Sequence, residues 1–267
     1  MYSVTGRIRS IKQPRGGYIK PSEFKTIELN DGQVLNDKEN IHASIIGMAV
    51  DYLTRLMIGS DLLEAFKISV KGVNSAIRLG ATTIDEAKKY LSGIDGLNDD
   101  SIINACKMVT FDVWYRNPVN APLAKTAKEI NPNEATIENI RTMVKRSINF
   151  FDEYGPITVD GFTFEPNGYT ETVSTGDGDF LTADTLWDFK VTKSKPTNKH
   201  TLQLLMYWIM GQHSGKPEYK NLTKLGIFNR RLNKVYLLDM GNVSSKTIAD
   251  VEKNVICYRF VSYRQTR

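Results

Sequence analysis

The stretch GDGDFLTADTLWDFKV, residues 176–191, decides the fold. Its two runs of aromatic and β-branched residues, separated by a short polar segment, predict two strands joined by a tight turn. We place the centre of this turn between Ala183 and Asp184. Asp179 on the first strand then lies opposite Asp188 on the second, and opposed residues share one face of a sheet with Cβ atoms about 5 Å apart. The predicted hairpin therefore brings two carboxylates together.

The same register distributes the other side chains of the hairpin between its two faces. Lys190 follows Asp188 by two residues and therefore shares its face. The expected cross-strand pairs are Phe180 with Trp187 and Leu181 with Leu186. The aromatic residues fall on the opposite face, where we expect part of the core: Phe180, Trp187 and Phe189, with Val191.

Two carboxylates and a lysine on one face have a specific chemical use. Like charges placed opposite each other destabilise a sheet, and a divalent cation between them removes that repulsion. Carboxylate oxygens suit a hard cation such as Mg²⁺. A neighbouring lysine can orient a water molecule or stabilise charge on a phosphate. The alternative is an Asp–Lys pair on the exposed surface of a hairpin, because D-x-K triplets are common.

Outward from the hairpin, the chain divides into a helical part and a β-rich part. The spacing of apolar residues predicts helices near 45–56, 62–79, 83–93, 101–116, 134–154 and 199–213, and one from 244. Strands are expected at 157–164, 169–175, 179–182, 185–191, 223–229 and 234–239. This order predicts an α+β fold with an irregular segment, 1–40, before one domain, 41–267. That domain is expected to be helical over 41–155 and β-rich over 156–267.

Composition indicates an ordinary folded protein. The 267 residues are 41% hydrophobic and 24% charged, which excludes a disordered chain. No apolar run reaches the roughly 18 residues of a membrane span, and residues 1–17 lack the apolar core of a secretory signal. The two cysteines are far apart, which argues against zinc and iron–sulfur sites. We therefore expect a cytoplasmic protein with no membrane partner.

The positive charge is concentrated at the start of the chain. The protein has a net charge of +5, and residues 1–25 contain six Lys or Arg residues and one acid. A basic segment beside a neutral body is suited to phosphate contacts. The alternative is a solvated, mobile terminus.

Three short motifs follow one another in and after the hairpin: G-x-x-D (Gly176, Asp179), D-x-K (Asp188, Lys190) and Q-x-x-x-Y (Gln203, Tyr207). In this order the chain resembles the PD-(D/E)xK nuclease superfamily, and most closely its RecB-like exonuclease branch. The resemblance covers about residues 40–55 and 157–240. It implies a restriction-endonuclease-like core, in which helices flank a short mixed β-sheet. The predicted helical N-terminal half is an addition to this core.

The resemblance also implies roles for individual residues. Asp179 and Asp188 are expected to bind Mg²⁺ or Mn²⁺, with the backbone carbonyl of Phe189 as a further ligand. Lys190 is the expected catalytic lysine. Gln203 and Tyr207 are four residues apart, share one helix face and are expected beside the DNA. Their alternative role is a polar stripe on an otherwise apolar helix.

Another expected metal ligand lies in the helical half. Members of the branch often carry G-x-x-x-H on an early helix, with the histidine as a metal ligand. This chain has Gly47 and, four residues later, Asp51 in place of that histidine. Aspartate can bind Mg²⁺ or Mn²⁺ as well. The alternative is an ion pair between Asp51 and Arg55 on the helix surface.

These observations and the resemblance predict a metal-dependent DNA nuclease, specifically an exonuclease, that needs Mg²⁺ or Mn²⁺ and no organic cofactor. Two other classes remain open. One is a catalytically silent nucleic-acid-binding module that keeps the fold. The other is a protein-binding subunit of a recombination or phage complex.

Overall fold

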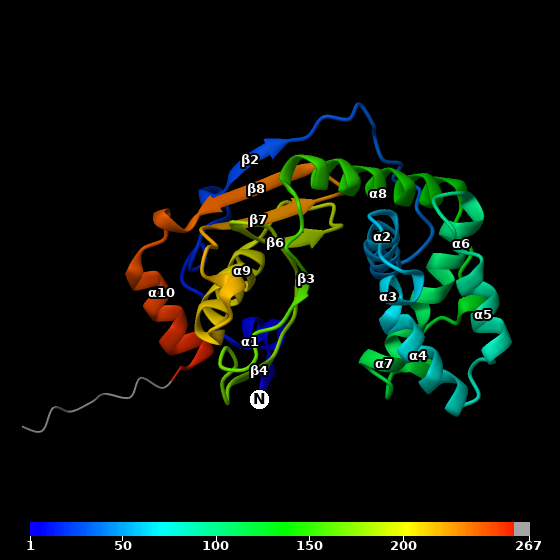
Figure 1. Ribbon diagram of the computed structural model, residues 1–267, viewed down its shortest axis with the longest axis horizontal. Helices are drawn as coiled ribbons and strands as arrows, with labels where there is room; N and C mark the ends of the chain where they lie inside the picture. Colours follow the sequence, from blue (N-terminus) through cyan, green and yellow to red (C-terminus); the bar gives the residue numbers. More distant parts are fainter. Residues whose placement is uncertain (259–267) are drawn as a thin grey trace, which may run out of the picture. The chain divides into compact units, whose positions relative to one another are not determined.

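The computed structural model describes residues 1–258, and these form two compact units (Figure 1). The first unit joins Met1–Leu29 to the chain from Tyr154 onward, and the second is Asn30–Glu153. The protein is α+β, as predicted: the second unit is helical, and the first contains a mixed sheet with helices. No helix within residues 1–258 is long and apolar enough to cross a membrane.

A six-stranded sheet forms the centre of the first unit, in the order β2-β8-β7-β6-β5-β3. Its strands are β2 (Lys25–Glu28), β3 (Val159–Phe162), β5 (Gly178–Leu181), β6 (Thr185–Lys190), β7 (Lys224–Asn229) and β8 (Lys234–Asp239). Neighbours run antiparallel except β6 and β7, which are parallel and joined through helix α9 (Asn198–Ser214). A second, two-stranded sheet pairs β1 (Tyr2–Ser3) with β4 (Val173–Thr175).

Helix α9 packs on one face of this sheet (Figure 1). It is apolar on most of its circumference, which is typical of a helix covered on several sides. Its leucines, including Leu202 and Leu205, are fully buried in one cluster with Leu186 of β6 and Ile227 of β7. The chain continues after β8 into α10 (Ser245–Val251) and a π-helical turn, Glu252–Ile256. The burial of the α9 leucines stabilises the fold by about 1.5–3 kcal/mol for each side chain.

The first 40 residues, which we expected to be irregular, contribute regular structure to the first unit. Helix α1 (Val4–Ser10) packs beside α9, with Val4 and Ile8 buried in the same core cluster. The Arg7 guanidinium donates hydrogen bonds to the carbonyl oxygens of Val255 and Asn254. After a 3-10 turn at Pro21–Glu23, β2 pairs with β8 at the edge of the sheet. The alternative of a solvated, mobile terminus is therefore wrong.

The second unit contains helices α2 (Ala43–Met57), α3 (Leu62–Ala65), α4 (Lys67–Arg78), α5 (Ile84–Ser92), α6 (Asp99–Met108), α7 (Asp112–Arg116) and α8, which spans Glu134–Tyr154. Two predicted helices are interrupted. The predicted helix 62–79 breaks at Phe66, and 101–116 passes through a 3-10 turn at Val109–Phe111. A Cβ at Gly72 of α4 would lie 1.8 Å from the Phe111 carbonyl oxygen. The close approach of α4 to this turn therefore requires glycine.

Candidate active site

The β5–β6 hairpin has the predicted register. Phe180 pairs with Trp187 and Leu181 with Leu186. The Thr182 amide donates to the Thr185 carbonyl at 3.0 Å and closes the turn. On the aromatic face, Phe180 is 3% and Trp187 is 1% exposed. The prediction that these aromatics belong to the core is confirmed.

Asp188, which is buried, and Lys190, which is half-buried, form an ion pair on the face of β6 that packs on α9. They alternate with Leu186, whose side chain lies in the α9 cluster, so all three point to that face. The Lys190 Nζ lies 2.9 Å from Oδ1 and 2.7 Å from Oδ2 of Asp188. Asp188 is only 4% exposed. The alternative of a pair on the exposed surface is therefore wrong for Asp188, whose carboxylate is withdrawn from solvent, while the Lys190 side chain is 20% exposed.

One oxygen of Asp188 is in an unusual position. Its Oδ2 is buried and accepts no hydrogen bond among the residues that the structure describes, although the Lys190 ammonium is in ionic contact with it. The Lys190 ammonium, 2.7 Å away, is therefore the contact that compensates this oxygen for the loss of water.

Asp179 lies beside this pair on the neighbouring strand. Its Oδ2 accepts a hydrogen bond of 2.5 Å from the backbone amide of Phe189. The charges of Asp179 and Asp188 both act on Lys190. Burial lowers the pKa of the Lys190 amine, but the two carboxylates raise it by more, so the pKa lies above its usual value. Lys190 is therefore charged at neutral pH. The structure brings Asp179, Asp188 and Lys190 together, as the motifs predicted.

Phe189 contributes to this site through its backbone and to the opposite face through its ring. The ring packs edge-on against Phe180 at 4.4 Å and Phe228 at 5.3 Å between centroids. The Arg230 guanidinium lies 3.9 Å above the same ring. This packing holds β6 at the residue between Asp188 and Lys190.

Gly176, the glycine of the G-x-x-D motif, is required by close packing. A Cβ at this position would lie 2.6 Å from Cγ2 of Val4 in α1. The Gly176 carbonyl accepts a hydrogen bond of 2.5 Å from the Tyr169 hydroxyl. Helix α1 therefore holds the turn that leads into Asp179.

Gln203 and Tyr207 of α9 lie on the site side of the helix. The Gln203 amide donates to the Tyr207 hydroxyl at 2.9 Å. Burial raises the pKa of Tyr207, the Gln203 hydrogen bond lowers it, and the charges of Asp188 and Asp179 raise it further. The tyrosine is therefore protonated and near both carboxylates. It is 3% exposed and stacks at 5.3 Å on Phe164, so it also has a structural role.

His200 belongs to this neighbourhood and was not predicted. It lies in the first turn of α9, where its Nδ1 accepts a hydrogen bond of 3.2 Å from the Thr197 amide. Burial lowers the pKa of His200, the Lys190 charge lowers it further, and Asp188 opposes these effects. The imidazole is therefore neutral with its proton on Nε2. Its only signal in the sequence is its place one turn before Gln203.

Asp51 lies in α2 of the other unit. Its Oδ2 is 3.2 Å from Nε of Arg55, and the Asp51 side chain is 27% exposed. The ion pair proposed as the alternative is thus present. The metal-binding role of Asp51 stays a prediction.

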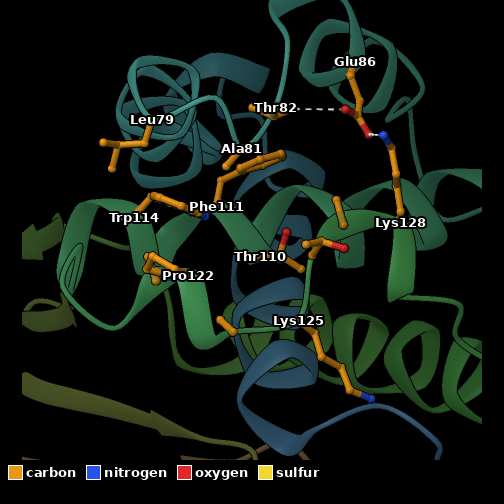
Figure 2. Close-up of a pocket in the computed structure, with 14 residues that line it drawn as sticks. Leu79, Ala81, Thr82, Glu86, Thr110, Phe111, Trp114, Pro122, Lys125 and Lys128 are labelled. Atoms are coloured by element: carbon orange, nitrogen blue, oxygen red, sulfur yellow. Dashed lines mark hydrogen bonds and ion pairs between the residues drawn. The ribbon is translucent and has the colours of Figure 1, made fainter.

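A separate cavity of about 540 Å³ lies within the second unit (Figure 2). Phe111, Trp114 and Pro122 are among the apolar residues of its lining. Glu86 is the one carboxylate among the lining residues. It accepts hydrogen bonds from the Thr82 and Tyr90 hydroxyls and lies 3.5 Å from Lys128 Nζ. Because this carboxylate is fully engaged, the cavity is a weaker candidate for catalysis than the hairpin site.

Comparison of the chain with known protein families, curated proteins and solved structures found no match. Within residues 1–258, no group of three or more His, Cys, Asp or Glu side chains is arranged to hold one metal ion. The candidate site is therefore defined by its own geometry: two acids and a lysine on adjacent strands, covered by α9.

Proposed function

We propose that the protein is a metal-dependent DNA nuclease whose active site contains Asp179, Asp188 and Lys190. The observation that carries this proposal is the ion pair between buried Asp188 and half-buried Lys190, beside Asp179, whose carboxylate accepts the Phe189 amide hydrogen bond. Buried ionic groups are costly unless they are paired or coordinate metals. The charges of both aspartates act on Lys190, and a divalent cation between the two carboxylates would offset their mutual repulsion.

The donor set fits Mg²⁺ or Mn²⁺. Carboxylate and carbonyl oxygens are the ligands that both ions prefer. Asp179 and Asp188 would hold the ion, with the Phe189 carbonyl and Asp51 as additional proposed ligands. A bound ion of this kind polarises a phosphodiester and lowers the pKa of a coordinated water. If Asp51 is a ligand, Asp51→Ala weakens Mn²⁺ binding; an unchanged affinity would remove Asp51 from the site.

The protein's own groups have distinct roles in this proposal. The Lys190 Nζ remains protonated beside Asp188 and donates hydrogen bonds to the oxygens of the scissile phosphate. Tyr207 and Gln203 form a hydrogen-bonded pair that borders the substrate. Leu186 and the leucines of α9 keep the site dry, which strengthens these electrostatic interactions.

The order of elements supports the proposed relation to the PD-(D/E)xK superfamily. Antiparallel β3, β5 and β6 are followed by α9 and by β7, which is parallel to β6. A restriction-endonuclease-like core has this order of strands and helix. The assignment as an exonuclease rests on the resemblance to the RecB-like branch. The proposal includes the cytoplasmic location expected from the sequence.

The decisive experiment is a cleavage assay with end-labelled linear DNA, in Mn²⁺, in Mg²⁺ and in chelator. We expect loss of label only with a metal ion. Asp179→Asn should abolish it. The control is Asp184→Asn, because Asp184 is an aspartate in the turn of the same hairpin and forms an ion pair of 2.7 Å with Lys224 of β7, outside the site. Equal activity in both variants would overturn the proposal.

The assay also separates the two other classes. A DNA mobility shift without cutting in any metal would support the silent binding module. Absence of both cutting and binding would favour the protein-binding subunit.

A further inference from the structure

We propose that residues 12–20 and 190–199 together form a single surface that binds the phosphate backbone of a nucleic acid strand beside Lys190. This inference rests on the proposed function only for the identity of the neighbouring site. Both segments contain basic residues and no Asp or Glu: Lys12, Arg15 and Lys20 in the first, and Lys190, Lys193, Lys195 and Lys199 in the second.

The two segments are far apart in sequence but in contact in the structure. A Cβ on Gly17 would lie 2.7 Å from the Cβ of Asn198. The Thr201 hydroxyl donates a hydrogen bond of 2.7 Å to the Ile19 carbonyl. The N-terminal segment therefore lies against the first turn of α9, the turn that contains His200 and adjoins Lys190.

Both segments are held in defined conformations. Gly16 and Gly17 adopt φ angles of +88° and +100°, and the Gly17 amide donates to the Pro14 carbonyl at 2.9 Å. Glycine is needed for this turn, because other residues rarely adopt such angles. In the second segment, the buried Asn229 amide donates to the carbonyls of Thr192 and Ser194 at 2.9 Å and 3.2 Å. A surface fixed before binding loses little conformational entropy when a ligand binds.

The basic side chains of this surface are available for a ligand. Six of them are exposed: Lys12, Arg15, Lys20, Lys193, Lys195 and Lys199. Within residues 1–258 none of these six forms an ion pair, whereas Lys224 and Lys234 in the same unit each pair with an acid. Glu23, the acid nearest in sequence to Lys20, uses its carboxylate to accept the Lys20 amide hydrogen bond. The surface therefore carries an uncompensated positive charge.

A polyanion that runs past the active site matches this charge. Each phosphate contact by Lys or Arg releases counterions, so DNA binding weakens as salt is added. The slope of log binding constant against log salt concentration becomes steeper by about 0.7–0.9 for each contact. Arg7 is not part of this surface, because its guanidinium donates hydrogen bonds to carbonyls of the π-helical turn Glu252–Ile256. Removal of residues 1–25 would also remove α1 and the first residue of β2, so substitutions are the appropriate test.

The experiment measures binding of a fluorescent DNA oligonucleotide in chelator over a range of salt concentrations. It compares the wild type with Lys12→Ala/Arg15→Ala/Lys20→Ala and with Lys193→Ala/Lys195→Ala/Lys199→Ala. The control is Lys220→Ala/Lys246→Ala/Lys253→Ala, which removes the same charge from exposed positions of the same unit outside both segments. Circular dichroism melting verifies that each variant is folded.

We expect each of the two test variants to lower the salt slope by about 2, and the control to leave it unchanged. A wild-type slope in either test variant, or an equal loss in the control, would overturn the inference. Because binding is measured without metal, the result is independent of cleavage. If the wild type cuts DNA but the test variants keep the wild-type salt slope, only the proposed binding surface is refuted. If the wild type never cuts DNA but the test variants have a smaller salt slope, only the proposed nuclease activity is refuted.

Discussion

Each compact unit contains a buried aspartate, and the two carboxylates have different hydrogen-bond and ionic partners. Asp112 of the second unit is 1% exposed. Its Oδ2 accepts from the Tyr52 hydroxyl at 2.5 Å and its Oδ1 from the Ser69 hydroxyl at 2.6 Å. Arg116 adds a longer ionic contact at 3.8 Å. Both oxygens are therefore satisfied by neighbouring helices.

Asp188 of the first unit is 4% exposed, but its partners differ. Its carboxylate contacts the Lys190 ammonium, and the charge of a second aspartate, Asp179, acts on the same lysine. The comparison shows that burial of a carboxylate does not by itself indicate a functional site. What distinguishes Asp188 is an ionic partner in place of hydroxyl donors, with a second aspartate on the neighbouring strand.

The largest expected difference between the two aspartates is in cleavage. Asp188→Asn should reduce turnover by about 10³-fold or more, because it removes a metal ligand. Asp112→Asn should leave turnover per folded molecule unchanged. Initial rates with end-labelled DNA, normalised to the folded fraction from circular dichroism, measure both. Comparable loss in the two variants would mean that neither aspartate has a special chemical role.

Lys190→Ala should lower kcat by about 10²–10³ while DNA binding is retained, the usual effect of removing one electrostatic stabiliser. It also leaves Asp179 and Asp188 without their shared cation, so the melting temperature in chelator should fall. Mn²⁺ should raise the melting temperature of Lys190→Ala by more than it raises that of the wild type. Lys224→Ala, which removes the partner of the exposed Asp184, is the control. Full activity in Lys190→Ala would contradict its assigned role.

Asp112→Leu should destabilise the protein by about 2–5 kcal/mol, because two buried hydroxyls, those of Tyr52 and Ser69, lose their acceptor. Asp112→Asn should cost less, since its amide oxygen and nitrogen can serve the same two rotatable hydroxyls. Urea unfolding followed by circular dichroism gives both values. An equal cost for the two substitutions would show that packing, and not hydrogen bonding, determines the role of Asp112.

The smallest effect concerns pH. Burial raises the pKa of Asp112, and the hydrogen bonds from Ser69 and Tyr52 only partly oppose it. The native state then retains this proton at pH values where the unfolded chain has lost it. Its contribution to stability is present below the unfolded pKa of about 4 and is lost as pH rises through the native value. The stability of Asp112→Asn relative to wild type should therefore increase as pH rises from 4. A constant difference would contradict the assigned shift.

Several features of both units were predictable because they depend on local patterns. The hairpin register follows from a two-residue turn and strict alternation, so the pairing of Phe180 with Trp187 was predicted correctly. The helix at Glu134–Tyr154 has a long apolar period and was predicted with its observed ends. Helix α1 was missed because it has seven residues, too few for a periodic signal.

The partners of the buried charges depend on tertiary packing and had no sequence signal. Asp112, Tyr52 and Ser69 come from different helices, and no spacing in the chain relates them. The motif suggested that Asp188 and Lys190 are neighbours, but their burial results from the packing of α9. The contact between Gly17 and Asn198 joins the two chain segments of the first unit and likewise depends on the folded chain.

The most direct test of the central claim is a Mn²⁺ titration followed by electron paramagnetic resonance, in which free and bound ions are distinguished without any substrate. The account predicts saturable binding by the wild type and by Asp112→Asn, and loss of that binding in Asp188→Asn. Binding by Asp188→Asn that equals the wild type, or no binding by the wild type, would contradict the assignment of Asp179 and Asp188 as a metal site.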